Sequence, residues 1–212
     1  MTKELQKVAI ESAIELREWL SENHSSSSSV WLVTWKKDSG HPYVSYDEIV
    51  DQCLCYGWID SLPRKLDELR TMRRISPRDS KSNWSQLNKA RVSRLIQEGL
   101  MEPSGLAVVE QAKKNGAWDF LDDVERLEVP DDLCREFEKY PGSRRLFDRF
   151  PASSRRAILE WIKTAKTEAT RRKRIDETAR KAAQNKKANH PKGRDAGPRD
   201  ELASDTADEV SG

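Results

Sequence analysis

The feature that most constrains this chain is its seven tryptophans, set in a sequence of which 36% is hydrophobic and 35% is charged. Such a composition predicts a compact part that depends on large aromatic side chains and another part that stays solvated. One tryptophan stands in the stretch CYGWIDS, residues 55–61. A basic segment from Arg64 to Arg78 follows, and then KSNWS at residues 81–85. Aromatic residues and glycine beside aspartate and a row of arginines indicate a site rather than plain core.

Length, charge and cysteine content limit the possible classes. A chain of 212 residues holds one domain of ordinary size or two small ones. A net charge of +2 is too small to attract the whole chain to nucleic acid or to anionic membranes. Three cysteines make no disulfide framework and suit a reducing compartment. The first residues lack the apolar core of a signal peptide, and no apolar run is long enough to span a membrane. We expect a soluble, cytoplasmic protein without membrane insertion.

The first 122 residues predict an α+β domain, because helical and strand periodicities both occur there. The predicted helices cover residues 4–22, 46–56, 87–98 and 105–115, and the predicted strands cover 30–35, 58–61 and 69–75. Ser45 with Glu48 three residues later forms the sequence pattern of a capping box. The domain is expected to be a small sheet with packed helices.

The rest of the chain divides into a helical part and a polar tail. Residues 129–187 predict a small all-helical domain, beginning at Pro130 and ending in a long helix from Thr167 that is rich in lysine and arginine. Residues 188–212 contain almost no large apolar side chain, so they cannot bury enough surface to order themselves. We expect this tail to be disordered.

Two neighbouring groups of residues are candidates for a ligand site. In the first, Asp60 stands near arginines whose guanidinium groups can hold a carboxylate or phosphate with two bonds, namely Arg70, Arg73, Arg74 and Arg78. In the second, the SNWS stretch stands at a loop-to-helix junction, where backbone N–H groups favour anions. The plainer interpretations are a solvated sheet face held by ion pairs and an ordinary helix cap. The ligand-binding candidates are Trp58, Asp60, Arg70, Arg74, Arg78, Ser82, Asn83 and Trp84.

Other chemistry finds little support in the sequence. Cys53 and Cys55 point to different sides of a helix, and the three histidines are scattered, so we expect no metal and no cofactor. The run Arg171, Arg172, Lys173 and Arg174 could contact phosphates or direct nuclear import in a eukaryote, but no aromatic residue interleaves with it. A solvated helix face is therefore the favoured interpretation of this run, and nucleic acid is the less favoured partner. The sequence leaves catalytic residues, oligomeric state and source organism open.

Several stretches together resemble the YdeI/OmpD-associated (OmdA-like) family, also called bacteriocin-protection proteins. They are WL at 19–20, VWLV at 30–33, CYGWIDS at 55–61, RISPR at 74–78, SNWS at 82–85, VPDDL at 129–133 and LEWI at 159–162. The resemblance covers about residues 5–187. Ile75 and Thr71 depart from it, because the family usually has aromatic residues near these positions. The resemblance implies an α+β first domain, loosely YjbR/CyaY-like, a helical second domain, and a role in tolerance to bacteriocins or cationic peptides.

These observations leave three functional hypotheses, of which the least favoured is nucleic-acid binding through residues 163–187, to be decided by a salt titration. The first is a binding or adaptor protein that holds an anionic small molecule or an acidic peptide through the aspartate, arginine and tryptophan cluster. The second is an enzyme acting on a small anionic substrate, with Asp60 as the base and Arg74 or Arg78 as the clamp for a developing anion. Convergence of these side chains on one pocket would favour the second hypothesis.

Overall fold

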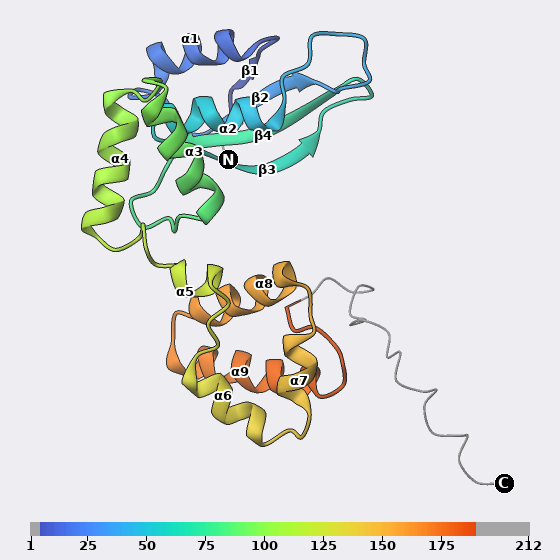
Figure 1. The fold of residues 1–212 in the computed structure, drawn as a ribbon. Coiled ribbons are helices and arrows are strands. Elements are labelled where there is room, and N and C mark those ends of the chain that lie inside the picture. The colour runs from blue at the N-terminus through green and yellow to red at the C-terminus, as the bar shows by residue number, and fades with distance from the viewer. Residues whose placement is uncertain (1–4, 190–212) are drawn as a thin grey trace, which may run out of the picture. The chain divides into compact units, whose positions relative to one another are not determined.

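The computed structural model describes residues 5–189 and divides the chain into two compact units, Met1–Leu121 and Asp122–Gly212 (Figure 1). The first unit holds a four-stranded sheet with helices, and the described part of the second is helical. The predicted α+β class is confirmed. Residues 190–212, which make up most of the predicted tail, lie outside the described residues, while Ala188 is buried.

The sheet of the first unit has the strand order β1-β2-β4-β3. Its strands are β1 (Lys7–Ala9), β2 (Val30–Trp35), β3 (Trp58–Lys65) and β4 (Arg70–Pro77). β1 pairs with β2 in parallel, and the other pairs are antiparallel. β3 and β4 form a hairpin that is longer than the sequence predicts. Pro63 is accommodated because β3 is an edge strand with a register shift between Asp60 and Pro63.

The predicted helix over residues 4–22 is wrong in its first part. Residues 7–9 form β1, and helix α1 (Ala13–Asn23) begins only after Ser12, whose hydroxyl accepts a hydrogen bond from the Glu15 amide. Val8 lies opposite Leu32 in the sheet and is buried. Pairing with the buried strand β2 therefore overrides the local helical periodicity, since the tertiary contact satisfies both the backbone and the side chain.

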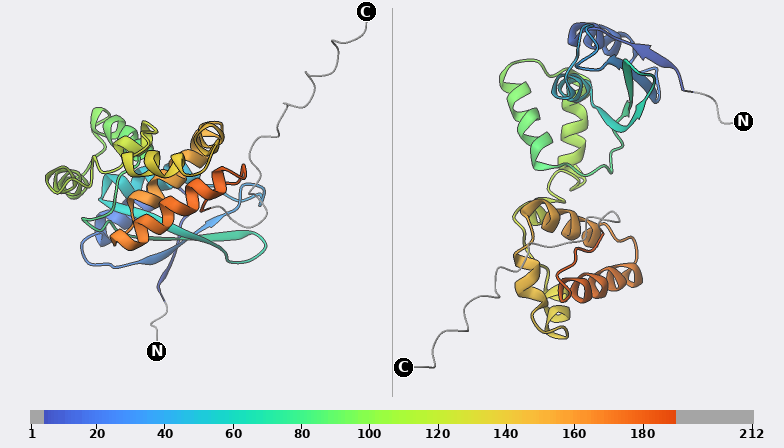
Figure 2. Two further views of the ribbon diagram at one scale, coloured as in Figure 1. Left: turned by 90° about the horizontal axis from the view of Figure 1, so that it is seen from below. Right: turned by 90° about the vertical axis from the view of Figure 1, so that its right-hand side faces the viewer.

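Three further helices complete this unit: α2 (Tyr46–Cys55), α3 (Gln86–Gln97) and α4 (Pro103–Lys114). The capping box of Ser45 and Glu48 is confirmed, with both reciprocal hydrogen bonds formed. The views in Figure 2 show α2, α3 and α4 on one side of the sheet. Leu16 of α1, Leu54 of α2, and Leu32 and Ile75 of the sheet belong to one hydrophobic core.

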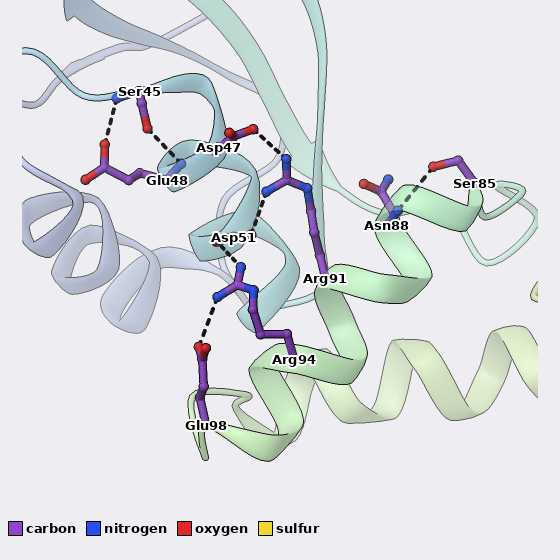
Figure 3. Close-up of polar contacts among 9 residues, drawn as sticks. All are labelled: Ser45, Asp47, Glu48, Asp51, Ser85, Asn88, Arg91, Arg94 and Glu98. Atoms are coloured by element: carbon purple, nitrogen blue, oxygen red, sulfur yellow. Dashed lines mark hydrogen bonds and ion pairs between the residues drawn. The ribbon is translucent and has the colours of Figure 1, made fainter. Parts of the chain in front are cut away.

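A network of ion pairs joins α2 to α3 (Figure 3). Arg91 donates to Asp47 at 2.5 Å and to Asp51 at 3.0 Å. Arg94 bonds Asp51 at 2.5 Å and Glu98, in its own helix, at 3.0 Å. Only 13% of the Arg91 side chain and 18% of the Asp51 side chain is exposed, so these pairs are better protected from solvent than ordinary surface ion pairs.

The second unit consists of short helices around a core of its own. They are α5 (Asp122–Glu125), α6 (Asp131–Glu138), α7 (Ser143–Asp148), α8 (Ala152–Lys163) and α9 (Glu168–Ala182). Leu133, Phe147 and Ile162 have no exposed surface. α9 contacts α6, α7 and α8, and it ends at Ala182, before the predicted limit near residue 187.

Candidate functional site

The strand register separates the predicted site residues onto two faces of the sheet. Val30 lies opposite Ile75, and both are buried in the core under the helices. Because side chains alternate along a strand, Trp31 and its partner Arg74 lie on the other face. Asp60 is the cross-strand partner of Ile75 and shares the helix-covered face. Asp60 and Arg74 therefore do not meet.

Asp60 is bound instead by Arg73, one of the arginines that the sequence groups with it, and by Tyr46, which the sequence does not indicate. Arg73 Nη1 donates to Asp60 Oδ2 at 2.9 Å, and only 15% of the Asp60 side chain is exposed. Tyr46 at the start of α2 hydrogen-bonds the same carboxylate, and the Arg73 guanidinium lies 4.5 Å from the Tyr46 ring centroid. Burial, reinforced by the Asp60 charge, raises the pKa of Tyr46. This arrangement neutralises Asp60 within the fold and leaves little of it for a substrate.

Trp58 has a structural environment. Its side chain is 1% exposed and belongs to the main core. The indole Nε1 donates to the His24 carbonyl at 3.2 Å, and the Trp19 ring meets the indole edge-on at 5.6 Å between centroids. A buried tryptophan whose N–H is satisfied in this way stabilises the fold rather than presenting a ligand surface.

One arginine of the first predicted group, Arg78, meets the second predicted group at residues 82–85. Arg78 lies over the Trp84 ring at 3.7 Å from its centroid, and Nη2 donates to the Asn83 carbonyl at 2.5 Å. Burial lowers the pKa of Arg78 to about 10. Ser82 takes part in the preceding turn, while Ser85 caps α3. Since Arg78 is 7% exposed and Trp84 is 2% exposed, this cluster braces the segment between β4 and α3.

The helix-free face of the sheet carries a set of arginines over tryptophans. Arg64 lies 4.9 Å from the Trp31 ring centroid, and Arg70 lies 5.6 Å from that of Trp35. Arg74 is the cross-strand neighbour of Trp31, and Arg70 is that of Trp35. We call this surface the arginine–tryptophan face and define it as Trp31, Trp35, Arg64, Arg70, Met72 and Arg74. A guanidinium over an indole is held by cation–π attraction and keeps its charge toward solvent.

Positive charge exceeds negative charge on the arginine–tryptophan face. Asp67 in the hairpin turn pairs with Arg70 at 2.7 Å. The hydrogen bond from the Arg70 side chain lowers the pKa of Asp67. Glu11 accepts from Trp35 Nε1 at 3.1 Å. Among the described residues nothing accepts a hydrogen bond from the buried Nε of Arg74, and Arg64 is exposed. The face therefore carries more positive than negative charge, while both indoles are covered: Arg64 lies over Trp31, which is 8% exposed, and His41 stacks on Trp35 at 3.9 Å between ring centroids.

Sequence reasoning identified Arg70 and Arg74 but missed Trp31, Trp35 and Arg64. A signal for the tryptophans was available, because residues four apart in a strand share a face. The stretch VWLVTW places both indoles on the same side of β2. The position of Arg64 could not be found in this way, since it depends on where the β3–β4 hairpin pairs.

The second unit contains a pocket of about 190 Å³ that both charged and apolar residues line. Leu159 and Ile162 are among the apolar ones. The cations of the lining are already engaged: Lys163 pairs with Asp123 at 2.5 Å, and Arg171 bonds Asp132 at 2.7 and 2.9 Å. A charged ligand would have to break these pairs to bind.

Within residues 5–189, no three histidine, cysteine or acidic side chains gather as a metal site requires. No helix in that range has the length and apolar character needed to cross a membrane. Cys53 and Cys55 are free and buried, and burial raises the pKa of both thiols.

Comparison with protein families assigns the two units separately. Residues 126–185 match the family described as "Bacteriocin-protection, YdeI or OmpD-Associated", so the second unit carries a domain of the family that the sequence resembles. Residues 8–108 match a model described as "Domain of unknown function (DUF8412)". No curated protein and no solved structure matches the chain.

Proposed function

We propose that this chain, whose C-terminal domain is of the YdeI/OmpD-associated type, is a cytoplasmic binding or adaptor protein that holds an anionic partner on the arginine–tryptophan face. The observation that carries the proposal is the strand register, which sets Arg64, Arg70 and Arg74 on one face together with Trp31 and Trp35. Arginine side chains stacked on indoles lose less freedom on binding than mobile ones, so their charge is pre-organised for phosphate or carboxylate groups.

The enzyme alternative has less support from the geometry. It requires Asp60 as a base with Arg74 or Arg78 as an anion clamp. Asp60 is bonded to Arg73 under the helices, Arg74 belongs to the opposite face, and Arg78 is buried against Trp84. A base and its clamp must reach the same reacting group, and this arrangement favours binding over catalysis.

Retention on immobilised heparin, a general polyanion, tests the binding proposal. Arg64→Gln/Arg74→Gln removes two charges from the face and should elute at clearly lower salt than the wild type, because each lost contact reduces counterion release. Arg172→Gln/Lys173→Gln removes two exposed charges from α9 and serves as the matched control. Equal loss of retention in both variants would show that only total charge matters.

The proposed role in tolerance follows from the family description of residues 126–185. Bacteria expressing the wild-type chain should survive a higher dose of a cationic antimicrobial peptide than bacteria expressing the Arg64→Gln/Arg74→Gln variant at the same protein level. Survival that is unchanged by the variant would separate the tolerance role from the arginine–tryptophan face.

A further inference from the structure

We infer that the pocket of the second unit is a binding site for a free amino acid with an apolar side chain, a ligand that carries one positive and one negative charge at neutral pH. This site belongs to a different unit from the arginine–tryptophan face, and neither depends on the other. Three properties of the pocket support such a ligand: its volume, the mixture of charges in its lining, and the apolar residues beside them.

The size and the charge of the pocket limit what it can hold. Helices α5, α8 and α9 and the segment before α6 contribute to its lining. An engineered cavity of about 150 Å³ holds one benzene molecule, so a pocket of about 190 Å³ suits a small molecule rather than a segment of chain. Two acidic and two basic side chains give the lining no net charge, and they are Asp123, Glu128, Lys163 and Arg171.

The ion pair between Lys163 and Asp123 decides which charges the ligand carries. Lys163 Nζ lies 2.5 Å from Asp123 Oδ1, and both side chains are partly exposed. A ligand with a single charge takes the place of one member of the pair and leaves the other without a partner, which is costly. A zwitterion replaces both members, because its ammonium group binds Asp123 while its carboxylate binds Lys163. The pair is then exchanged for two new ones.

Arg171 and Glu128 give each end of the ligand a second contact. Arg171 donates to Asp132 through Nε at 2.7 Å and through Nη2 at 2.9 Å, and this bidentate bond fixes the guanidinium. Its Nη1 has a long contact of 3.5 Å to the Ile162 carbonyl, so it can donate to a carboxylate while Asp132 stays bound. Glu128 pairs with Arg126 at 2.6 Å, but both side chains are exposed, so an ammonium group can replace Arg126 at low cost.

Apolar residues beside these charges favour a ligand with an apolar side chain. Leu159 and Ile162 line the pocket from α8, and Lys163 lies one turn along the helix from Leu159. An amino acid whose carboxylate binds Lys163 therefore has its side chain within reach of Leu159 and Ile162. Glycine has no such side chain, so burial of apolar surface favours leucine, methionine or phenylalanine over glycine.

The segment that carries Glu128 is held in a strained conformation. Leu127 has a φ of 59°, in the left-handed region that leucine seldom adopts. The Glu128 amide donates to the Asp123 carbonyl at 2.9 Å, which ties this segment to α5. Strained residues persist where the surrounding structure fixes them, and they gather at ligand sites. The backbone thus brings the carboxylates of Glu128 and Asp123 into the lining of one pocket.

A chemical-shift titration of the isotope-labelled full chain with leucine, methionine and phenylalanine tests the site. Three analogues each lack one feature of leucine: isopentylamine lacks the carboxylate, isocaproate lacks the amino group, and glycine lacks the apolar side chain. We expect leucine, methionine or phenylalanine to bind, with shifts centred on residues 123–130, 159–163 and 171. For leucine, the affinity should exceed that for each analogue by at least about tenfold, because each lacks one charge-assisted hydrogen bond or the apolar contact.

Variants connect each end of the ligand with its partner. Asp123→Asn should remove most of the preference for leucine over isocaproate, and Lys163→Gln should reduce the preference for leucine over isopentylamine. The matched control is Lys113→Gln, which removes the cation of an exposed ion pair with Glu110 in α4 and should leave leucine binding unchanged. If either pocket variant fails to fold, the comparison of leucine with its analogues on the wild type still decides.

Several outcomes would overturn the assignment. Absence of binding by all three apolar amino acids would refute the site itself. Equal binding of leucine and isocaproate, or of leucine and isopentylamine, would refute the exchange of the Lys163–Asp123 pair for a zwitterion. Equal binding of leucine and glycine would refute the role of Leu159 and Ile162. None of these results affects the arginine–tryptophan face, which heparin retention tests separately.

Discussion

Replacing Gly105 with alanine should destabilise the first unit, although helix propensity alone predicts the opposite. Gly105 lies inside α4, where glycine is about 1 kcal/mol less favourable than alanine. A Cβ atom at this position would meet the Cys55 carbonyl oxygen at 2.2 Å and the Leu54 carbonyl oxygen at 2.8 Å. Real Cβ contacts essentially never fall below 3.0 Å, and both neighbours are backbone atoms that cannot rotate away.

The size of the effect follows from the displacement required. α4 and the end of α2 must separate by at least 0.8 Å, the difference between 3.0 and 2.2 Å. Overpacking of this kind costs about 1–3 kcal/mol, and strain on the hydrogen bond from the Glu102 amide to the Cys55 carbonyl adds about 1 kcal/mol. After subtraction of the propensity gain, the net loss is about 2 kcal/mol, which corresponds to a fall in Tm of roughly 8 °C.

Thermal unfolding followed by circular dichroism provides the measurement. The matched control is Ala107→Gly, which makes the reverse exchange at an exposed position two residues away in α4 and should lower stability by about 1 kcal/mol. If Gly105→Ala instead raises Tm, propensity dominates, and the close approach of α4 to the carbonyl end of α2 would be refuted.

Three further predictions concern ion pairs and thiols. Asp51→Asn should lower the free energy of unfolding, measured by chemical denaturation, by about 1–3 kcal/mol, because the mostly buried Arg91 loses a partner. Its control is Glu98→Gln at the exposed end of the network, which should change that free energy by less than about 0.5 kcal/mol. Arg171 holds the pKa of Asp132 below its usual value. The folded protein therefore binds a proton at Asp132 less readily than the unfolded chain does. The stabilisation by this ion pair is present above about pH 4 and is lost as the pH falls through the folded-state pKa. The Tm advantage of the wild type over Asp132→Asn should therefore be present at neutral pH and vanish in strong acid; an advantage that persists there would contradict the pair's role. Of the three cysteines, only partly exposed Cys134 should react quickly with a thiol reagent in the folded protein, and all three in denaturant; rapid labelling of Cys53 or Cys55 would show that the α2 core opens readily.

Local patterns in the sequence determined most of the elements of this protein. The capping box at Ser45, the apolar run that forms β2 and the breaks at proline and glycine in the second unit depend on neighbours within a few residues, so a reader of the sequence can find them. The resemblance to the YdeI/OmpD-associated family also belongs to the sequence, and the match over residues 126–185 confirms it for the C-terminal domain.

Strand pairing decided what the sequence could not. Residues 7–9 have a helical pattern, yet they form a strand because β2 offers a parallel partner. Asp60 binds Arg73 rather than Arg74, since adjacent residues of a strand point to opposite faces and the register places Asp60 beside Ile75. The same register brings Arg64 over Trp31 from a different strand. Register depends on contacts between residues far apart in the chain, and a one-residue shift would exchange every side chain between the core and the arginine–tryptophan face.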